Sequence, residues 1–196
     1  KAIELVRDMK TGWNLGNTFD ATAGGNSLSS EMSWGQPKTT KAMIDGLAAS
    51  GIKTIRIPVS WSRHITDASY SISPAWMNRV KEVVDWAIED GMYVVLNIHH
   101  DNYEKNAKMP KSAGFYPTDE NYEESAQFVC NTWAQISLAF NNGYDEHLIF
   151  EVLNEPRLRG TSEEWYYNAT SPKSISAMNN LNKLTQNILD VIRASG

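Results

Sequence analysis

Two spacings of apolar residues alternate along the chain. Short runs of consecutive, mostly β-branched residues predict buried strands, and between them apolar residues recur every three or four positions, as on one face of a helix. The predicted strands are 11–17, 52–60, 92–101 and 147–153, and the predicted helices are 39–51, 73–91, 121–140 and 174–196. The pattern therefore indicates four consecutive strand–helix units.

The helix over 73–91 is the most clearly marked. Ser73 can cap its start, Pro74 suits the first helical position, and Gly91 can end it. Its residues expected to face the core are Trp76, Val80, Val83, Val84, Ala87 and Ile88. The corresponding residues are Phe128, Val129, Trp133, Ile136 and Phe140 in helix 121–140, and Ile175, Met178, Leu181, Ile188 and Ile192 in helix 174–196.

Nearly continuous apolar strands joined by helices are typical of an α/β fold with a parallel sheet covered by helices. An open doubly wound sheet and a (β/α)8 TIM barrel both fit, and four units would make half of such a barrel. Polar clusters follow the strand ends, at Asn14 and Asn17, Arg56, His99 and His100, and Asn154 and Glu155. Because "GWNLGNTF" lacks the spacing of a phosphate-binding loop, we favour the half barrel, with residues 1–196 as a single domain.

Composition narrows the classes of partner. The net charge of −5 comes without any basic stripe, so nucleic-acid binding is not expected. No apolar run approaches the roughly 20 residues that span a bilayer, so we expect no membrane partner. Cys130 is the only cysteine, which excludes a disulfide framework. Seven tryptophans and eight tyrosines fit either core packing or a surface on which flat ligands stack.

The fourth strand ends in "NEP", residues 154–156. At the rim of a barrel, partial burial of Glu155 would raise the pKa of its carboxyl, because burial disfavours the charged form. A proton-donating Glu is what cleavage of a glycosidic bond needs, and Asn154 could donate a hydrogen bond to a neighbouring sugar hydroxyl. A solvated charge at the rim is the alternative interpretation of Glu155.

The second and third strand ends carry a cation and two imidazoles. Arg56 could form a structural salt bridge, for example to Glu151, or keep a nearby catalytic carboxylate ionised. Adjacent strand residues such as His99 and His100 point to opposite faces, and no zinc-type spacing accompanies them. Hydrogen bonding to a substrate or to a carboxylate is therefore the expectation for the pair, and neither a metal site nor a cofactor is predicted.

The segments "GWNLGNTFD", "MSWGQPKTT", "IRIPVSW", "NIHHD" and "FEVLNEPR" occur in the order and spacing of glycoside hydrolase family 5. The chain resembles the bacterial and rumen endoglucanase branch of that family. The resemblance extends over essentially the whole chain and over the first half of the family's domain.

The resemblance implies a secreted, retaining (β/α)8 glycosidase that cuts β-1,4-glucans. It implies that Glu155 is the general acid/base, that Asn154 binds the sugar 2-hydroxyl, and that Arg56 supports the nucleophile. The remaining cleft residues that it implies are His99, His100, Asn17, Asp20 and Trp34. Core packing stays an alternative for Trp34, and also for Trp61.

The family's nucleophile, a second Glu after strand seven, lies outside these 196 residues. A half barrel would also leave strands one and four as open edges and would expose apolar core. We therefore expect a partner, which is a chain carrying units five to eight, a second copy of this half, or a removed part of the same protein. A non-catalytic glycan-binding half barrel and an inactive assembly scaffold remain alternatives.

Overall fold

The computed structural model describes residues 2–103 and 113–196. The strands are β1 (Gly12–Asn14), β2 (Thr54–Ile57), β3 (Tyr93–Asn97) and β4 (Leu148–Glu151). The helices are α1 (Ala2–Met9), α2 (Lys41–Ala49), α3 (Pro74–Glu89), α4 (Tyr122–Phe140) and α5 (Pro172–Ala194), with short 3-10 helices at Leu28–Met32, Ser62–His64 and Asp119–Asn121. Part of the loop between β3 and α4, residues 104–112, lies outside the described residues.

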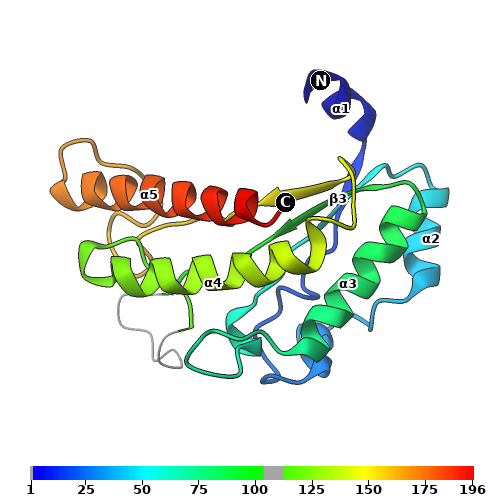
Figure 1. Cartoon of the computed structure of the whole chain (residues 1–196), viewed down its shortest axis with the longest axis horizontal. Coiled ribbons are helices and arrows are strands. Elements are labelled where there is room, and N and C mark those ends of the chain that lie inside the picture. Colours follow the sequence, from blue (N-terminus) through cyan, green and yellow to red (C-terminus); the bar gives the residue numbers. More distant parts are fainter. Residues whose placement is uncertain (1, 104–112) are drawn as a thin grey trace.

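All four strands are parallel, and their order in the sheet is β1-β2-β3-β4. Right-handed crossovers between consecutive neighbours place every connecting helix on the same face of the sheet. Successive helices from α2 to α5 pack against one another, and α4 and α5 run side by side (Figure 1). This single helix layer is the arrangement of a barrel, because a doubly wound sheet reverses its strand order and carries helices on both faces.

The convex face of the sheet forms the core beneath the helices. Ile55 and Ile57 of β2 and Val94 and Leu96 of β3 are fully buried there. The predicted apolar stripes of α3 and α4 pack against them, and Gly91 ends α3 with a left-handed φ of 68°. The predicted pattern of these elements is therefore confirmed.

The predicted stripe of α5 is partly wrong. Ile188 is fully buried, but Ile175 and Met178 are 39% and 42% exposed, and Ala177 and Leu184 are buried in their place. The contact with α4 rotates α5 so that its buried stripe runs through 177, 184 and 188. Ile175 and Met178 then lie beside that stripe, where the described chain covers them only in part.

The concave face of the sheet, which is the inside of a barrel, is largely polar. Strand register places Arg56 beside Val95, and Asn97 beside Glu151, on this face. Arg56 and Glu151 are half-buried, and the large exposed apolar side chains of the described residues lie elsewhere, for example at Trp13. The concave face itself is therefore not the bare apolar surface that was expected, because Arg56, Asn97 and Glu151 occupy it. Apolar side chains are exposed instead at the two borders of the half, at Trp13 of β1 and at Ile175 and Met178 of α5.

The two outer strands have one neighbour each among the described residues, since β1 pairs with β2 and β4 pairs with β3. The predicted open edges are thereby confirmed. Helix α1, which the sequence pattern did not predict, stands apart from the helix layer (Figure 1). It lies at the amino ends of the strands, where Asp8 accepts a hydrogen bond from Tyr93, and its Ile3 and Val6 are exposed. No helix in the described part of the chain has the length and apolarity to cross a bilayer.

Candidate active site

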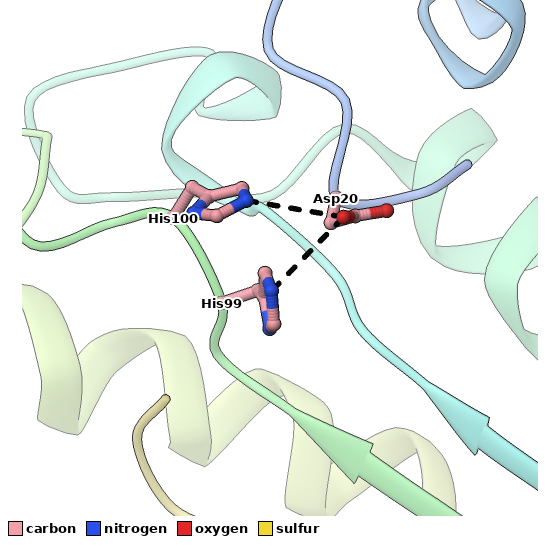
Figure 2. Close-up of side chains that lie close together, drawn as sticks. All are labelled: Asp20, His99 and His100. Carbon is pink, nitrogen blue, oxygen red and sulfur yellow. Dashed lines mark ion pairs between the residues drawn. The ribbon is translucent and has the colours of Figure 1, made fainter. Parts of the chain in front are cut away.

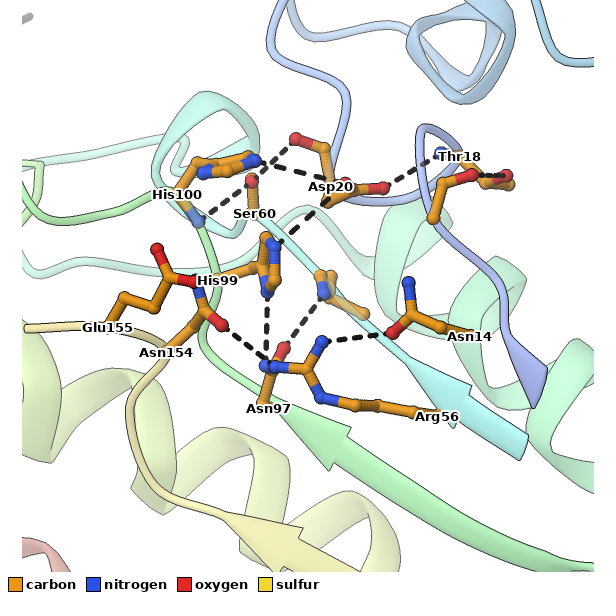
Figure 3. A network of polar contacts seen from close by, with 12 residues as sticks. Asn14, Thr18, Asp20, Arg56, Ser60, Asn97, His99, His100, Asn154 and Glu155 are labelled. Atoms are coloured by element: carbon orange, nitrogen blue, oxygen red, sulfur yellow. Dashed lines mark hydrogen bonds and ion pairs between the residues drawn. The ribbon is translucent and has the colours of Figure 1, made fainter. Parts of the chain in front are cut away.

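Arg56 joins three strand ends at the carboxyl rim of the sheet (Figure 3). Its Nε and Nη2 donate to the two carboxylate oxygens of Glu151, both at 2.7 Å. Nη2 also donates to Oδ1 of Asn154 at 2.8 Å, and Nη1 donates to Oδ1 of Asn14 at 3.0 Å. The structural salt bridge to Glu151 considered from the sequence is confirmed. Because a guanidinium only donates, it also holds the amide oxygen of Asn154 and leaves Nδ2 to donate elsewhere.

Glu151 is held as a carboxylate below the rim. Partial burial opposes its ionisation, but hydrogen bonds from Arg56 and Asn97 outweigh burial, and the pKa of Glu151 lies below its usual value. The pKa of Arg56 is raised, chiefly by its hydrogen bonds to Glu151. The pair is therefore a fixed, charged support under Asn154.

The loop between β1 and α2 is held by buried charges. Arg79 of α3 donates to both oxygens of Glu31, at 2.8 and 2.9 Å, and the two side chains are only 5% and 1% exposed. Glu31 also accepts from the backbone amide of Thr39. This contact fixes the loop that presents Trp34, whose ring lies 5.5 Å from the ring of His100 and is 40% exposed.

Asp20, His99 and His100 form one cluster above the strand ends (Figure 2). Oδ2 of Asp20 lies 4.0 Å from Nε2 of His99 and 3.8 Å from Nε2 of His100, while Oδ1 accepts from the amide of Thr18. Burial lowers the pKa of His99 to about 4, with a further contribution from His100, and burial also lowers the pKa of His100. Both rings are therefore neutral near neutral pH, and each can donate one hydrogen bond and accept another.

The carboxylate of Asp20 and the two imidazoles are also ligand types that bind a divalent metal ion, and their ligand atoms lie within 4.8 Å of one another. The separations of 3.8 and 4.0 Å equally fit a hydroxyl oxygen held between a ring N–H and a carboxylate. The expectation that the histidines serve hydrogen bonding stays a prediction.

Glu155 lies beside Asn154 at the same rim (Figure 3). It lines a small cavity together with His99 and His100, so the strand ends do bring the predicted residues together. Its side chain is 67% exposed and pairs with Nη1 of Arg157 at 2.7 Å, and its φ of 40° is left-handed. The expected partial burial of Glu155 is therefore not seen in the described half, because only solvent lies opposite the strand end.

Two other predicted residues lie apart from this cluster. Asn17 is exposed in the turn after β1, where its φ of 59° is left-handed, and no contact joins it to the histidines. Trp61 is fully buried and its indole donates to the backbone oxygen of Asn97, so core packing is the correct alternative for Trp61. Trp34 is exposed beside His100, so it does not pack in the core, and its contact with substrate in the cleft stays a prediction.

Two residues that contact the predicted site residues were missed in the sequence. Asn97, two positions before His99, contacts both His99 and Glu151, and that spacing places the two side chains on the same face of the strand. Arg157, two positions after Glu155, stacks at 4.1 Å on the ring of Trp165, which is 74% exposed. The same alternation of faces would have identified Asn97 as a neighbour of the site.

Residues 16–196 match the family described as Cellulase (glycosyl hydrolase family 5). The chain belongs to this family. Family 5 structures similar to it form (β/α)8 barrels, and the four parallel strands described above are half of one. The resemblance found in the sequence motifs and the barrel fold class are therefore confirmed.

Relatives in family 5 are similar over the whole chain. Endoglucanase B of Ruminococcus albus is 47% identical over 197 residues, covering 100% of this chain and 43% of that protein. The cellulase/esterase CelE of Acetivibrio thermocellus is 39% identical, covering 100% of this chain and 21% of that protein. The chain spans about half the length of curated relatives such as the endoglucanases of Ruminococcus albus, or less.

Solved structures give the same picture. A variant of a family 5 lichenase from Caldicellulosiruptor, determined with cellotetraose, is 42% identical with a TM-score of 0.92, covering 100% of this chain and 51% of that one. A xyloglucan-specific endo-β-1,4-glucanase from a metagenomic library, determined with cellotriose, is 38% identical with a TM-score of 0.86, covering 99% and 53%. Both solved chains are thus about twice as long as this one, which aligns with about half of each.

Proposed function

We propose that the chain is the acid/base-bearing half of a secreted endo-β-1,4-glucanase that hydrolyses glucans with retention. The proposal rests on the arrangement of side chains at the carboxyl rim of the sheet. Arg56 holds Asn154 next to Glu155, and Glu155 lines the same cavity as His99 and His100. Endoglucanases are the relatives that match along the whole chain, which supports this substrate class.

In this proposal Glu155 protonates the oxygen that links two glucose units as the bond breaks, and later deprotonates the incoming water. Nδ2 of Asn154, whose oxygen is occupied by Arg56, donates to the 2-hydroxyl of the sugar at the cleavage point. Asp20, His99, His100 and Trp34 contact sugar hydroxyls and ring faces, and Asn17 adds a contact further out.

The nucleophile comes from units five to eight, on a separate chain or a continuation of this one. The open edges of β1 and β4 supply the backbone groups with which strands eight and five would pair. Closure of the barrel covers the exposed side of Glu155, and retention requires the second carboxylate about 5–5.5 Å from it.

The test is a fusion of this chain to the second half of the barrel of Ruminococcus albus Endoglucanase B, called the fused barrel below. We expect it to hydrolyse carboxymethylcellulose and to release products whose anomeric configuration, followed by NMR, is retained. Glu155→Gln should lower kcat on cello-oligosaccharides by about 10²–10⁴-fold. Dinitrophenyl cellobioside, whose leaving group needs no proton, should lose far less in the glycosylation step.

Glu123→Gln, at an exposed position of α4, is the matched control and should behave like the parent fused barrel. Equal losses on both substrates in Glu155→Gln would contradict the acid role. A folded fused barrel that binds cello-oligosaccharides without cleaving them would instead support the non-catalytic glycan-binding alternative.

A further inference from the structure

Asn97 is fully buried at the carboxyl end of β3, and the reaction proposed above gives it no part. Both polar atoms of its side chain nevertheless have partners, and Nδ2 faces two groups of the site. Oδ1 lies 3.2 Å from the backbone nitrogen of Val59, and Nδ2 lies 3.1 Å from Oε1 of Glu151 and 3.1 Å from Nδ1 of His99. Asn97 therefore connects the Arg56–Glu151 pair to His99 by hydrogen bonds (Figure 3).

The partners of this amide fix its orientation. A backbone N–H can only donate, so the atom facing Val59 must be the amide oxygen. An ionised carboxylate can only accept, so the atom facing Glu151 must be the NH2 group. A flipped amide would lose both hydrogen bonds, and because the Asn97 side chain is fully buried, water cannot replace them. A buried polar group left unpaired costs about 1–3 kcal/mol.

With the amide so oriented, its second N–H points at Nδ1 of His99. A neutral imidazole carries one proton, and a protonated Nδ1 would place two hydrogens against each other. The lone pair of His99 therefore lies on Nδ1 and its proton on Nε2. Nε2 is the atom that faces Oδ2 of Asp20 across 4.0 Å.

We propose that Asn97 is a positioning residue that keeps the proton of His99 on Nε2, so that His99 donates to a hydroxyl of the glucan and Asp20 accepts from the same hydroxyl. This inference rests on the proposed function of the site and names how one sugar hydroxyl is held in it. The gap supports it, since an oxygen about 2.8 Å from each partner spans 4.0 Å, which is too long for a direct hydrogen bond.

The groups around His99 are consistent with a neutral donor. The charged or titratable side chains that act on its ring are His100, Asp20, Arg56 and Glu151. Burial disfavours an imidazolium there, and the guanidinium of Arg56 and a charged His100 oppose it further. The same proton argues against a metal ion in the cluster, because ligation through Nε2 would move the proton to Nδ1 and break the contact with Asn97.

The first test uses the 196-residue chain labelled with ¹⁵N-histidine. Multiple-bond ¹H–¹⁵N spectra near neutral pH distinguish the protonated from the bare ring nitrogen, and His99→Gln identifies the signals of His99. We expect the parent chain to carry the proton on Nε2. Asn97→Asp replaces the donor at Nδ1 by an acceptor, so the proton should move to Nδ1 or His99 should become doubly protonated.

Asn180→Ala is the matched control, because Asn180 is an equally buried amide, on α5, that bonds to Asp119 and not to a histidine. It should leave the proton of His99 on Nε2 even where it lowers stability. A proton on Nδ1 in the parent chain would overturn the proposal, and so would an unchanged spectrum in folded Asn97→Asp or the same change in Asn180→Ala.

The second test uses the fused barrel. Asn97→Asp should lower kcat/KM on cello-oligosaccharides by roughly tenfold or more, as expected for loss of one oriented hydrogen bond, and should add an ionisation to the pH profile. An unaltered kcat/KM and pH profile would overturn the role of Asn97. The spectra need no activity, so an inactive fused barrel with the proton on Nε2 would refute the proposed reaction and leave the positioning of His99 standing.

Discussion

His64 offers a sharp test of the packing beneath the candidate site. Its ring is 1% exposed, stacks on Trp76 with centroids 3.5 Å apart, and bonds through Nε2 to the hydroxyl of Ser30. Ser30 belongs to the loop that carries Trp34, so His64 joins that loop to α3. Burial lowers the pKa of His64 from 6.5 to about 4.

The sign of the effect follows from the direction of this shift. Below about pH 6.5 the unfolded chain binds a proton that the folded chain does not, so the folded state loses stability as pH falls toward the folded pKa of about 4. At about 1.4 kcal/mol for each pKa unit, the share of His64 is close to zero near pH 7. It grows to about 2 kcal/mol lost near pH 5 and about 3 kcal/mol below pH 4.

The assay is urea denaturation of the parent chain and of His64→Phe, each near pH 7 and near pH 5. Phe keeps the ring on Trp76 but cannot titrate, while the lost bond to Ser30 lowers stability by a similar amount at both pH values. The stability difference between parent and variant should therefore shift by about 2 kcal/mol in favour of the variant on acidification. His64→Asn should show the same shift, and a difference independent of pH in both variants would refute a buried neutral His64.

Three further predictions concern the charges and the cleft. Arg79→Met should lower the free energy of unfolding by about 3–5 kcal/mol, measured in urea, because it leaves Glu31 buried without its cation. Glu151→Gln should lower the free energy of unfolding by about 1–3 kcal/mol, since Arg56 then keeps only neutral partners. Protonation of a carboxyl with a depressed pKa destabilises the folded state below about pH 4.5, so the variant should lose less stability than the parent chain on acidification. In the fused barrel, Trp34→Ala should raise KM for cello-oligosaccharides several-fold with little change in kcat, whereas Trp34→Phe should retain most of the binding.

The sequence was a good guide wherever one periodicity decided the structure. The stripe of α4 through Trp133 and the Pro74 start of α3 follow from local rules, and both are found as predicted. The exposure of Ile175 could not be predicted, because it depends on how α5 is rotated against α4. A periodic pattern of apolar residues fixes which side chains form a stripe but not which neighbour covers each of them.

The candidate site was predicted to a similar extent. Strand ends placed Arg56 and Asn154 at one rim because parallel strands share a direction, and the structure joins them by a hydrogen bond. The exposure of Glu155 was missed, since burial at that rim depends on groups outside the described strands. Asn97 was missed because its importance lies in which atoms it orients, and that information is contained in angles and distances.

Arg56 has one more consequence, for the curvature of the half barrel. Its planar group reaches Asn14 of β1 on one side and Glu151 and Asn154 of the fourth strand end on the other. The guanidinium is planar and rigid, so these hydrogen bonds connect the first and fourth strand ends across the inside of the sheet. Because strand number and stagger set the radius of a closed barrel, this tie would hold the half sheet curved before a second half meets β1 and β4.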